Sequence, residues 1–421
     1  MRELVLEKNK ELPQGWSKIS FGNYLHLEYG KGLAKNLRNN LGTIPVYGSS
    51  GIIGYHDKFL ISESCLIVGR KGSAGEIHYV NEPCYAIDTT YYLKQNSLFD
   101  LKFLYYLLKS IQSKFIDSST AIPSLRRDDV HSTEIILPPL NEQKRIVAKI
   151  EELFSLLEST KEILEKTKIL LKQYRQSILK NVFEGKNSEN WQETKLEDVT
   201  EKAGTTNPKE YPNKEFFYCD IASVDNKNLK IKNPKHFLGR DAPSRARQLV
   251  HHNDVIFSTV RTYLHNIAMI PSKLDTQLCS TGFCVLRGTD QILNKFIFYL
   301  VQTMRFENYL NPLQRGTSYP AVRNNDIFNF KFLLPPLNEQ KRIVEKIEES
   351  FSLIEKNEKI VDSLLLQYTY IKNSILKQAF EGKLVIQDPN DEHAEILLEK
   401  IKQEKLLIQK QKASRSTKNV K

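Results

Sequence analysis

The stretch LPPLNEQKRIVAKIEELFSLLE, which begins at Leu137, returns as LPPLNEQKRIVEKIEESFSLIE from Leu334. The same offset of 197 residues (334 − 137) brings SILK at Ser177 back at Ser374 and FEGK at Phe183 back at Phe380. Proline is tolerated at or before the first turn of a helix, and glycine is favoured just after its end. The repeat therefore predicts two long helices within residues 137–186 and 334–383, each roughly 43 residues and about 65 Å long.

Apolar positions within each copy alternate steps of four and three residues, and this period of 3.5 is typical of a coiled-coil seam. The apolar seam positions are Ile146, Ile150, Leu153, Leu157, Leu164, Leu171 and Ile178 in the first copy, and Ile343, Ile347, Ile354, Val361, Leu364, Ile371 and Ile375 in the second. We expect the two helices to pair with each other. A symmetric antiparallel register would bury Thr167 beside Asn357. The alternative, two unrelated helices that each lie on their own domain, is less favoured because surface helices are usually much shorter.

Length and composition place the chain among multidomain globular proteins. Its 421 residues, 40% of them hydrophobic, suggest two or three domains. The opening MRELVLEKNK lacks the apolar run of a signal peptide, and no apolar stretch approaches the ~18 residues that span a bilayer, so we expect a soluble cytoplasmic protein. Five scattered cysteines favour reduced thiols over disulfides or zinc ligands, and no metal site is expected. A net charge of +11 favours a polyanionic partner without establishing one.

Two globular α/β regions, residues 1–136 and 187–333, each precede one long helix. A loop before each helix repeats at the same offset: STAIPSLRRDDV from Ser119 and RGTSYPAVRNNDI from Arg315. We call these two segments the frame loops, because Thr120, Pro123, Arg126 and Asp129 in the first are answered by Thr317, Pro320, Arg323 and Asp326 in the second. The central segments of the two regions barely align in sequence, although the loops and helices around them repeat. This pattern predicts two modules with the same kind of function and different targets. Residues 384–421 are expected to form a charged helical tail.

The LPPLNEQKRIV repeat, the globular region before each copy and the later FEGKL and QDPND segments resemble the DNA-specificity subunit of type I restriction-modification systems. The resemblance covers essentially the whole chain. It implies two α/β target-recognition domains separated by two long antiparallel coiled-coil helices, in a pseudo-two-fold internal repeat. It also implies that each domain reads one half of a split site in double-stranded DNA and that the helices set the gap. Two methyltransferase subunits and further nuclease and translocase subunits are the implied partners.

The residues favour a reader and scaffold over a catalyst. An adenine methyltransferase would need an NPPF or DPPY type of motif, and the only double prolines here are those of LPPL. No GxxxxGK[ST] phosphate loop is present, so an ATP-driven motor is not expected, and no cofactor is predicted. Two alternatives remain: a self-contained DNA-modifying enzyme, which would show such motifs, and a coiled-coil tether without a nucleic-acid role, which a salt-dependent shift of duplex DNA would exclude.

Major-groove readout uses arginine or lysine donors for guanine, presented on loops or helices that fit the groove, with further cations on phosphates. The first region carries candidates in glycine-interrupted loops, and the second carries them in a basic stretch and after a β run. These DNA-binding candidates are Lys31, Lys35, Arg38, Arg70, Lys71, Arg240, Arg245, Arg247 and Arg261. Arg126 and Arg323 belong to the repeated frame loops, so we expect them to contact phosphate or to hold the loop against the helix. For the other candidates, a solvated surface charge is an equally good interpretation.

Overall fold

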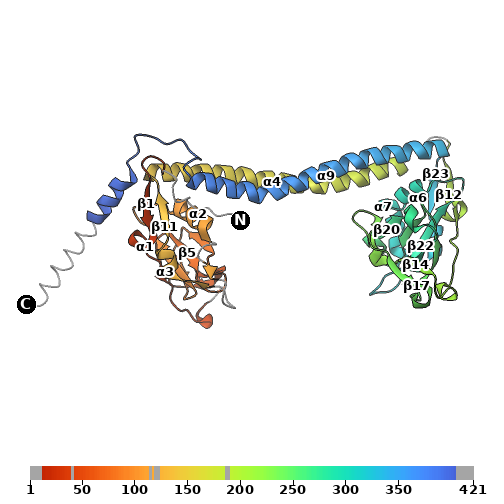
Figure 1. Ribbon diagram of the computed structural model, residues 1–421, viewed down its shortest axis with the longest axis horizontal. Helices are drawn as coiled ribbons and strands as arrows, with labels where there is room; N and C mark the ends of the chain where they lie inside the picture. Colours follow the sequence, from red (N-terminus) through yellow and green to blue (C-terminus); the bar gives the residue numbers. More distant parts are fainter. Residues whose placement is uncertain (1–11, 39–41, 113–115, 118–123, 185–189, 404–421) are drawn as a thin grey trace, which may run out of the picture. The chain divides into compact units, whose positions relative to one another are not determined.

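In the computed structural model, the described residues are 12–38, 42–112, 116–117, 124–184 and 190–403 (Figure 1). The chain divides into two compact units, Met1–Ile163 with Leu364–Lys421 and Leu164–Ser363. Each unit therefore combines one globular domain with part of each long helix.

The two long helices are the longest elements of the chain. Helix α4 spans Leu140–Glu184, and helix α9 spans Leu337–Phe380. Each follows a double proline, as the sequence predicts, and α9 is followed by Gly382, whose φ of +69° is in the left-handed region. A Cβ at this glycine would lie 2.4 Å from the Pro13 ring, so close packing also requires a glycine here.

The long helices pack against each other antiparallel in both units. In the first unit, Lys372 lies over the Phe154 ring at 4.8 Å, and one turn further along α4 the Tyr368 hydroxyl donates to Glu158. In the second unit, Lys168 pairs with Asp362 at 2.5 Å and Arg175 with Glu358 at 3.3 Å. In each case the partner position on α9 falls as the position on α4 rises.

The seam is buried mainly where a globular domain also covers it. Ile146 and Ile150 lie in the core of the first unit, and Ile347 and Ile354 lie in that of the second. Ile178, Val361 and Ile375 are also buried, Leu153, Leu157, Leu164, Leu171 and Ile343 are half-buried, and Leu364 and Ile371 remain exposed. Two helices bury only a narrow strip of each other, so seam residues at its border stay accessible to solvent.

The expected burial of Asn357 beside Thr167 is wrong. Asn357 is exposed, and Lys168, the neighbour of Thr167, pairs instead with Asp362. On this part of α9 the inward face is made by Ile354 and Val361, which turns Asn357 outward. No buried amide therefore fixes the register at this position.

The first domain holds two sheets. A four-stranded sheet has the order β2-β8-β5-β6, and a three-stranded sheet has the order β4-β3-β7, in which β3 and β7 are parallel. Their bounds are β2 Glu28–Tyr29, β3 Ile44–Gly48, β4 Gly51–His56, β5 Cys65–Gly69, β6 Ile77–Val80, β7 Tyr85–Ala86 and β8 Thr90–Lys94. Strand β1 (Ser17–Ser20) pairs with β11 (Glu134–Leu137) next to α4, and β9 (Ile116–Asp117) pairs with β10 (Ser124–Leu125). The helices are α1 Phe21–Tyr24, α2 Leu101–Ile111 and α3 Arg127–His131, with a 3-10 turn at Lys35–Leu37.

The second domain repeats this topology. Its first sheet has the order β13-β22-β19-β20, and its second has the order β17-β14-β21-β18, in which β14 and β21 are parallel. The bounds are β13 Thr200–Glu201, β14 Glu215–Cys219, β17 Lys235–Leu238, β18 Ala246–Val250, β19 Val255–Ser258, β20 Ile267–Met269, β21 Gln277–Ser280 and β22 Phe283–Gly288. Smaller pairs are β12 (Gln192–Lys195) with β23 (Lys331–Leu334) and β15 (Val224–Asp225) with β16 (Lys230–Ile231). The helices are α5 Leu196–Val199, α6 Asn294–Leu300, α7 Met304–Leu310 and α8 Asn324–Phe328, and short 3-10 turns lie at Pro208–Glu210, Ile221–Ser223, Gly239–Asp241, Thr262–Leu264, Ser272–Leu274 and Asn311–Leu313.

One glutamine of each NEQK segment joins a long helix to its domain. Gln143 is fully buried; its amide donates to the carbonyls of Pro138 and Leu98 at 3.0 and 3.1 Å and accepts from the Asp100 N–H at 2.8 Å. Asp100 is also the N-cap of α2, so this contact fixes the start of that helix against α4. The NEQK segment therefore both begins helix α4 and holds it against the first domain.

The same arrangement recurs in the second unit. Gln340 is fully buried, and its amide donates to the carbonyls of Pro335 and Gln291 at 2.8 and 2.9 Å while accepting from the Leu293 N–H at 2.9 Å. Helix α6 then packs between α9 and the sheet, as α2 does between α4 and its sheet (Figure 1).

The tail contributes to the first unit. Residues 394–403 are helical, and Asp391, whose side chain is largely buried, pairs with Arg145 of α4 at 2.6 Å. The Arg145 guanidinium holds the pKa of the Asp391 carboxyl below its usual value. The rest of the expected charged tail, residues 404–421, lies outside the described residues.

Candidate nucleic-acid interface

A turn between β7 and β8 gathers three of the predicted cations in the first domain. The Lys31 N–H donates to the Ala86 carbonyl at 2.9 Å, and the N–H groups of Arg70 and Lys71 donate to the Thr89 carbonyl at 2.9 and 3.3 Å. Gly30 makes this approach possible, because a Cβ there would lie 2.0 Å from the Ile87 carbonyl oxygen. Two loops far apart in sequence thus present their cations around one turn.

The first frame loop joins the same cluster. The Leu125 N–H donates to the Arg70 carbonyl at 2.9 Å, and Ser124 forms a β-bridge with Lys71. Arg126, the next residue, is exposed and precedes the first turn of α3. Thr120 and Pro123 of this loop lie outside the described residues.

The exposed ring of Tyr29, the buried ring of Tyr91 and the guanidinium of Arg127 complete this cluster, and no pattern in the sequence singled them out. The guanidinium groups of Arg70 and Arg127 lie 5.5 and 5.2 Å from the centroid of the Tyr29 ring. Tyr91 packs edge-on against Tyr29 at 4.9 Å. Burial and the hydrogen bond with Tyr29 raise the pKa of Tyr91 to about 12, so this phenol remains neutral beside the arginines at physiological pH.

Lys35 and Arg38 belong to a neighbouring loop. Arg38 directs its guanidinium to the Leu33 carbonyl, with Nη2 at 2.7 Å and Nε at 3.2 Å, and so closes its own loop. Lys35 is exposed in the 3-10 turn that this contact encloses. The structure gives Arg38 a local structural contact, and it leaves the Lys35 side chain accessible.

The equivalent turn of the second domain, between β21 and β22, gathers Arg245 and the loop of Arg261. The Thr281 N–H donates to the Arg245 carbonyl at 3.0 Å, and the Thr259 N–H donates to the Gly282 carbonyl at 2.9 Å. The second frame loop is joined here too, because the Val322 N–H donates to the Thr259 carbonyl at 2.9 Å. Arg323, which follows Val322, is exposed at the start of α8.

Arg240 and Arg247 are not brought to this turn by any described hydrogen bond. Arg240 lies in the turn after β17, 3.4 Å from the Asn213 side-chain oxygen and 3.7 Å from Asp241. The Nε of Arg247 donates to the Ser244 carbonyl at 3.2 Å. The structure thus separates the basic stretch into Arg245 at the turn and two arginines with other contacts, Arg240 with Asn213 and Asp241 and Arg247 with Ser244.

The frame loop of the second domain is held by an acidic residue. Asp326 accepts from the Arg323 N–H at 2.8 Å and pairs with the Arg315 guanidinium at 2.6 Å. Arg315 is the main reason that the pKa of Asp326 is lowered, so the pair stays ionised at neutral pH. Arg323 itself keeps its side chain exposed.

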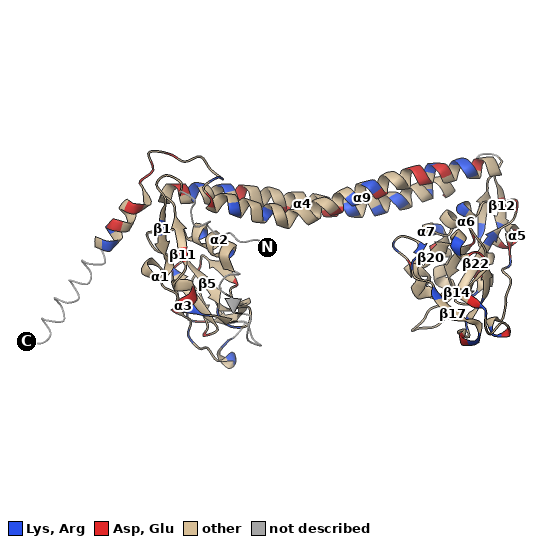
Figure 2. Cartoon of the chain, viewed as in Figure 1, with Lys and Arg blue, Asp and Glu red and all other residues tan. Residues whose placement is uncertain are grey.

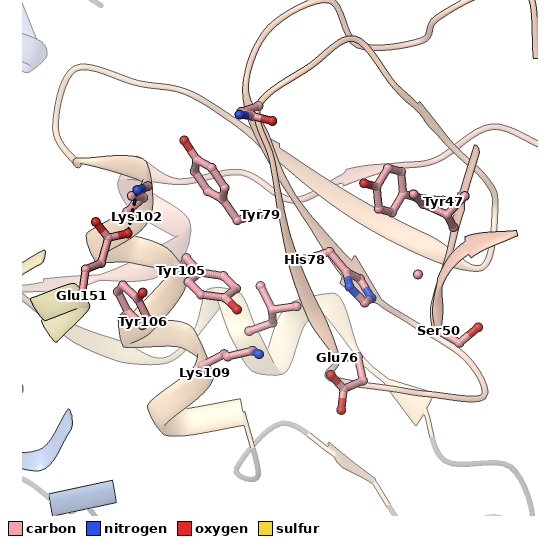
Figure 3. Close-up of a pocket in the computed structure, with 14 residues that line it drawn as sticks. Tyr47, Ser50, Glu76, His78, Tyr79, Lys102, Tyr105, Tyr106, Lys109 and Glu151 are labelled. Carbon is pink, nitrogen blue, oxygen red and sulfur yellow. Dashed lines mark hydrogen bonds and ion pairs between the residues drawn. The ribbon is translucent and has the colours of Figure 1, made fainter. Parts of the chain in front are cut away.

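A cleft in the first unit is formed by residues outside the cation cluster. It has a volume of about 980 Å³ and is lined by Tyr47, His78, Tyr79, Tyr105, Lys109 and the Lys102–Glu151 ion pair, among others (Figure 3). None of the predicted DNA-binding residues lines it. Residues of strands β3, β4 and β6 and of helices α2 and α4 line it.

Nothing in the described part of the chain forms a group of three His, Cys, Asp or Glu side chains able to hold a metal. All five cysteines are buried free thiols, with Cys65 and Cys84 Sγ atoms 3.6 Å apart. Among the described helices, none is both long and apolar enough to cross a membrane.

The two domains are similar, and each is joined to a long helix. Each gathers cationic residues around one turn, lysines and arginines in the first domain and arginines in the second. The family model for the type I restriction modification DNA specificity domain matches residues 13–168 and 188–366, which is more than half of the chain. The chain therefore belongs to this family, and it is a type I restriction-modification specificity subunit with a role in DNA sequence recognition.

Individual relatives support this assignment over nearly the full length. The EcoDI specificity subunit of Escherichia coli is 26% identical over 440 residues, which cover 96% of this chain and 98% of that protein. The MjaVIII specificity subunit of Methanocaldococcus jannaschii is 25% identical, with 90% of this chain and 95% of that protein covered. The crystal structure of the HsdS subunit from Thermoanaerobacter tengcongensis has the same fold, with a TM-score of 0.64, 20% identity, and coverage of 90% of this chain and 100% of that one.

Proposed function

We propose that each domain reads one half of a bipartite DNA site, while the paired long helices set the spacer and dock two methyltransferase subunits. Partner subunits would then carry out methylation and cleavage, and this chain would select the DNA sequence at which they act. The cations Lys31, Lys35, Arg38, Arg70, Lys71, Arg126, Arg240, Arg245, Arg247, Arg261 and Arg323 remain the candidates for DNA contact. The candidates around the turn between β7 and β8 and the turn between β21 and β22 are favoured, because several of them lie close together there.

One observation carries the proposal for two readers. In both domains the frame loop bridges to the loop that leaves a buried central strand, Ser124 to Lys71 in the first and Ala321 to Val260 in the second. Ser124 and Ala321 are equivalent at the offset of 197, but the residues they hold differ. A shared anchor that presents different side chains is what two readers of different half-sites require.

A repeated stripe on the long helices supports the docking of two identical partners. Leu156, Ile163 and Ile169 of α4 are answered at the offset of 197 by Leu353, Ile360 and Leu366 of α9, and all six are between 55% and 80% exposed. Figure 2 shows uncharged stretches between the charged residues of both helices. Exposed apolar residues that recur after seven and then six positions lie near one side of a helix and are suited to a helix of another protein. Because the stripe occurs twice, it favours two copies of the same partner.

We expect substitutions in the stripe to reduce methyltransferase binding without unfolding the chain. Leu366→Ser and its equivalent Ile169→Ser each change an exposed side chain, so stability should stay within about 0.5 kcal/mol of the parent. Each single variant should lower the number of bound methyltransferase copies from two towards one, and the double variant should lose both. Native mass spectrometry of the co-expressed complex measures this, with the exposed Gln367→Ser as the control. Full binding of two copies to the double variant would refute docking at the stripe.

A further inference from the structure

The loop that leaves β19 holds Arg261 in a strained backbone conformation. Arg261 has a φ of +48°, in the left-handed region that residues with a Cβ adopt only at a cost in free energy. The frame loop fixes this conformation, since the Arg261 N–H donates to the Pro320 carbonyl at 2.7 Å and the adjacent Val260 bridges to Ala321. A glycine would fit this backbone without strain, so the arginine side chain needs another explanation.

The guanidinium of Arg261 is positioned by few contacts. Its Cζ lies 4.7 Å from the centroid of the Tyr319 ring, and Nη2 donates to the Ser318 carbonyl at 3.0 Å. Its Nε is buried and has no hydrogen-bond partner among the residues that the structure describes. Arginine carries five N–H donors, so the contacts above hold the plane of the group but use little of its capacity.

The surroundings of Arg261 are aromatic and open to solvent. Tyr319 is 70% exposed although it lies in the frame loop, and Tyr263 and Leu264, just after Arg261, are exposed as well. An arginine with a purely structural role would gain nothing from a strained backbone or from a stacking ring left in water. Strain that is maintained by surrounding contacts is common at binding sites.

The first domain repeats this arrangement with different residues. Arg70 follows its buried strand β5, its carbonyl is bound by the frame loop, and its guanidinium lies against Tyr29, which is also exposed. Its Nε is likewise buried without a described partner. The recurrence of an arginine on a tyrosine next to each frame loop points to a shared task.

We propose that Arg261, held over the Tyr319 ring, reads a guanine of the half-site recognised by the second domain. This inference rests on the proposed function, namely that the second domain reads DNA. The guanidinium donates two parallel hydrogen bonds to guanine O6 and N7 in the major groove, the pairing that arginine geometry favours. Tyr319 is a positioning residue that keeps the guanidinium plane in place, and the frame loop fixes its distance from the helices.

Two substitutions and one matched control test this role. Arg261→Gly removes the donors and relieves the backbone strain, whereas Arg261→Lys keeps the charge but loses the planar fork. Thr276→Gly is the control, because Thr276 is an exposed residue with a φ of +59° in a turn that carries none of the candidate contacts. The readouts are the melting temperature and the set of sites methylated when each variant is co-expressed with the methyltransferase partner.

We expect Arg261→Gly to melt at or above the temperature of the parent, as Thr276→Gly should. Both Arg261 variants should become degenerate at one G·C position in one half-site, with discrimination there reduced about 10- to 100-fold. Tyr319→Ala should weaken discrimination at the same position, and Tyr319→Phe should retain it. Thr276→Gly should leave the motif unchanged.

Three results would overturn the inference: an unchanged motif in Arg261→Gly, an equal loss at all sequences as expected for a phosphate contact, or a clear drop in its melting temperature. The motif methylated with the unchanged parent chain distinguishes a failure of the Arg261 inference from a failure of the proposed function. A parent that directs methylation to no split motif refutes the two readers themselves, whereas a normal parent motif confines the failure to Arg261.

Discussion

One heptad inserted into each long helix at facing positions is expected to widen the gap between the two half-sites by up to about three base pairs. Lys168 of α4 pairs with Asp362 of α9, so insertions after Lys168 and after Val361 lengthen both helices at the same level. Seven residues add about 10 Å at 1.5 Å per residue and keep the seam on the same face. Dividing by roughly 3.4 Å per base pair gives the expected change in the gap.

The bases read on each side should not change in this variant, because neither recognition domain is altered. Methylation at the original site should be lost, and sites with the wider gap should replace it. A two-residue insertion in each helix is the contrasting variant, since it turns the apolar face by roughly 200° and should abolish specific methylation altogether. Full activity at the original gap after the heptad insertion would show that the helices do not set the spacing.

Replacing Gln340 with leucine should cause a large loss of stability. The Gln340 amide bonds the Pro335 and Gln291 carbonyls and the Leu293 N–H in a fully buried position. Leucine has a similar size but leaves these backbone groups without partners, and each buried unpaired group costs about 1–3 kcal/mol. We expect the free energy of unfolding to fall by at least about 2 kcal/mol in urea titrations.

Gln173→Leu, at an exposed position of α4, is the matched control and should change stability by less than about 0.5 kcal/mol. Gln143→Leu in the first unit should behave like Gln340→Leu, because the two glutamines make equivalent contacts. If Gln340→Leu unfolds at the same urea concentration as the parent, this glutamine does not join the long helix to its domain.

The long helices could be predicted from sequence because their signal is local. A 3.5-residue period between a double proline and a glycine determines both the element and its ends, and α9 ends at Phe380, just before Gly382. The role of Gln143 could not be predicted in this way. Its side-chain amide donates to the Leu98 carbonyl, which lies 45 residues earlier in the chain. From its sequence neighbours alone, the polar NEQK turn would be assigned to the solvent-exposed surface.

The strand order that the two domains share could not be predicted from the sequence either. CLIVG in β5 and VIFS in β19 hold equivalent central places in their sheets, yet the residues around them barely align. Strand order depends on pairings between distant segments, and many side-chain sets satisfy the same alternation of buried and exposed positions. The repeated frame loop was the only local indication that the middles share a fold.

The candidate site was only partly predictable for a similar reason. Glycine-interrupted loops drew attention to Lys31 and Arg70, whose backbones the structure brings to one turn. The same reasoning selected Arg38, which closes its own loop, and it missed Tyr29 and Tyr319. An aromatic ring is usually assigned to the core, and only its exposure in the folded domain reveals it as a platform for an arginine.

The most direct test of two separate readers on one chain is a map of methylated bases across a genome in cells that co-express this chain with its methyltransferase partner. We expect a split motif, two short defined sequences separated by a gap of fixed length and free composition, with methylation that depends on both halves. A continuous motif without a gap, or methylation that persists when either half is altered, would contradict the assignment of one half-site to each domain.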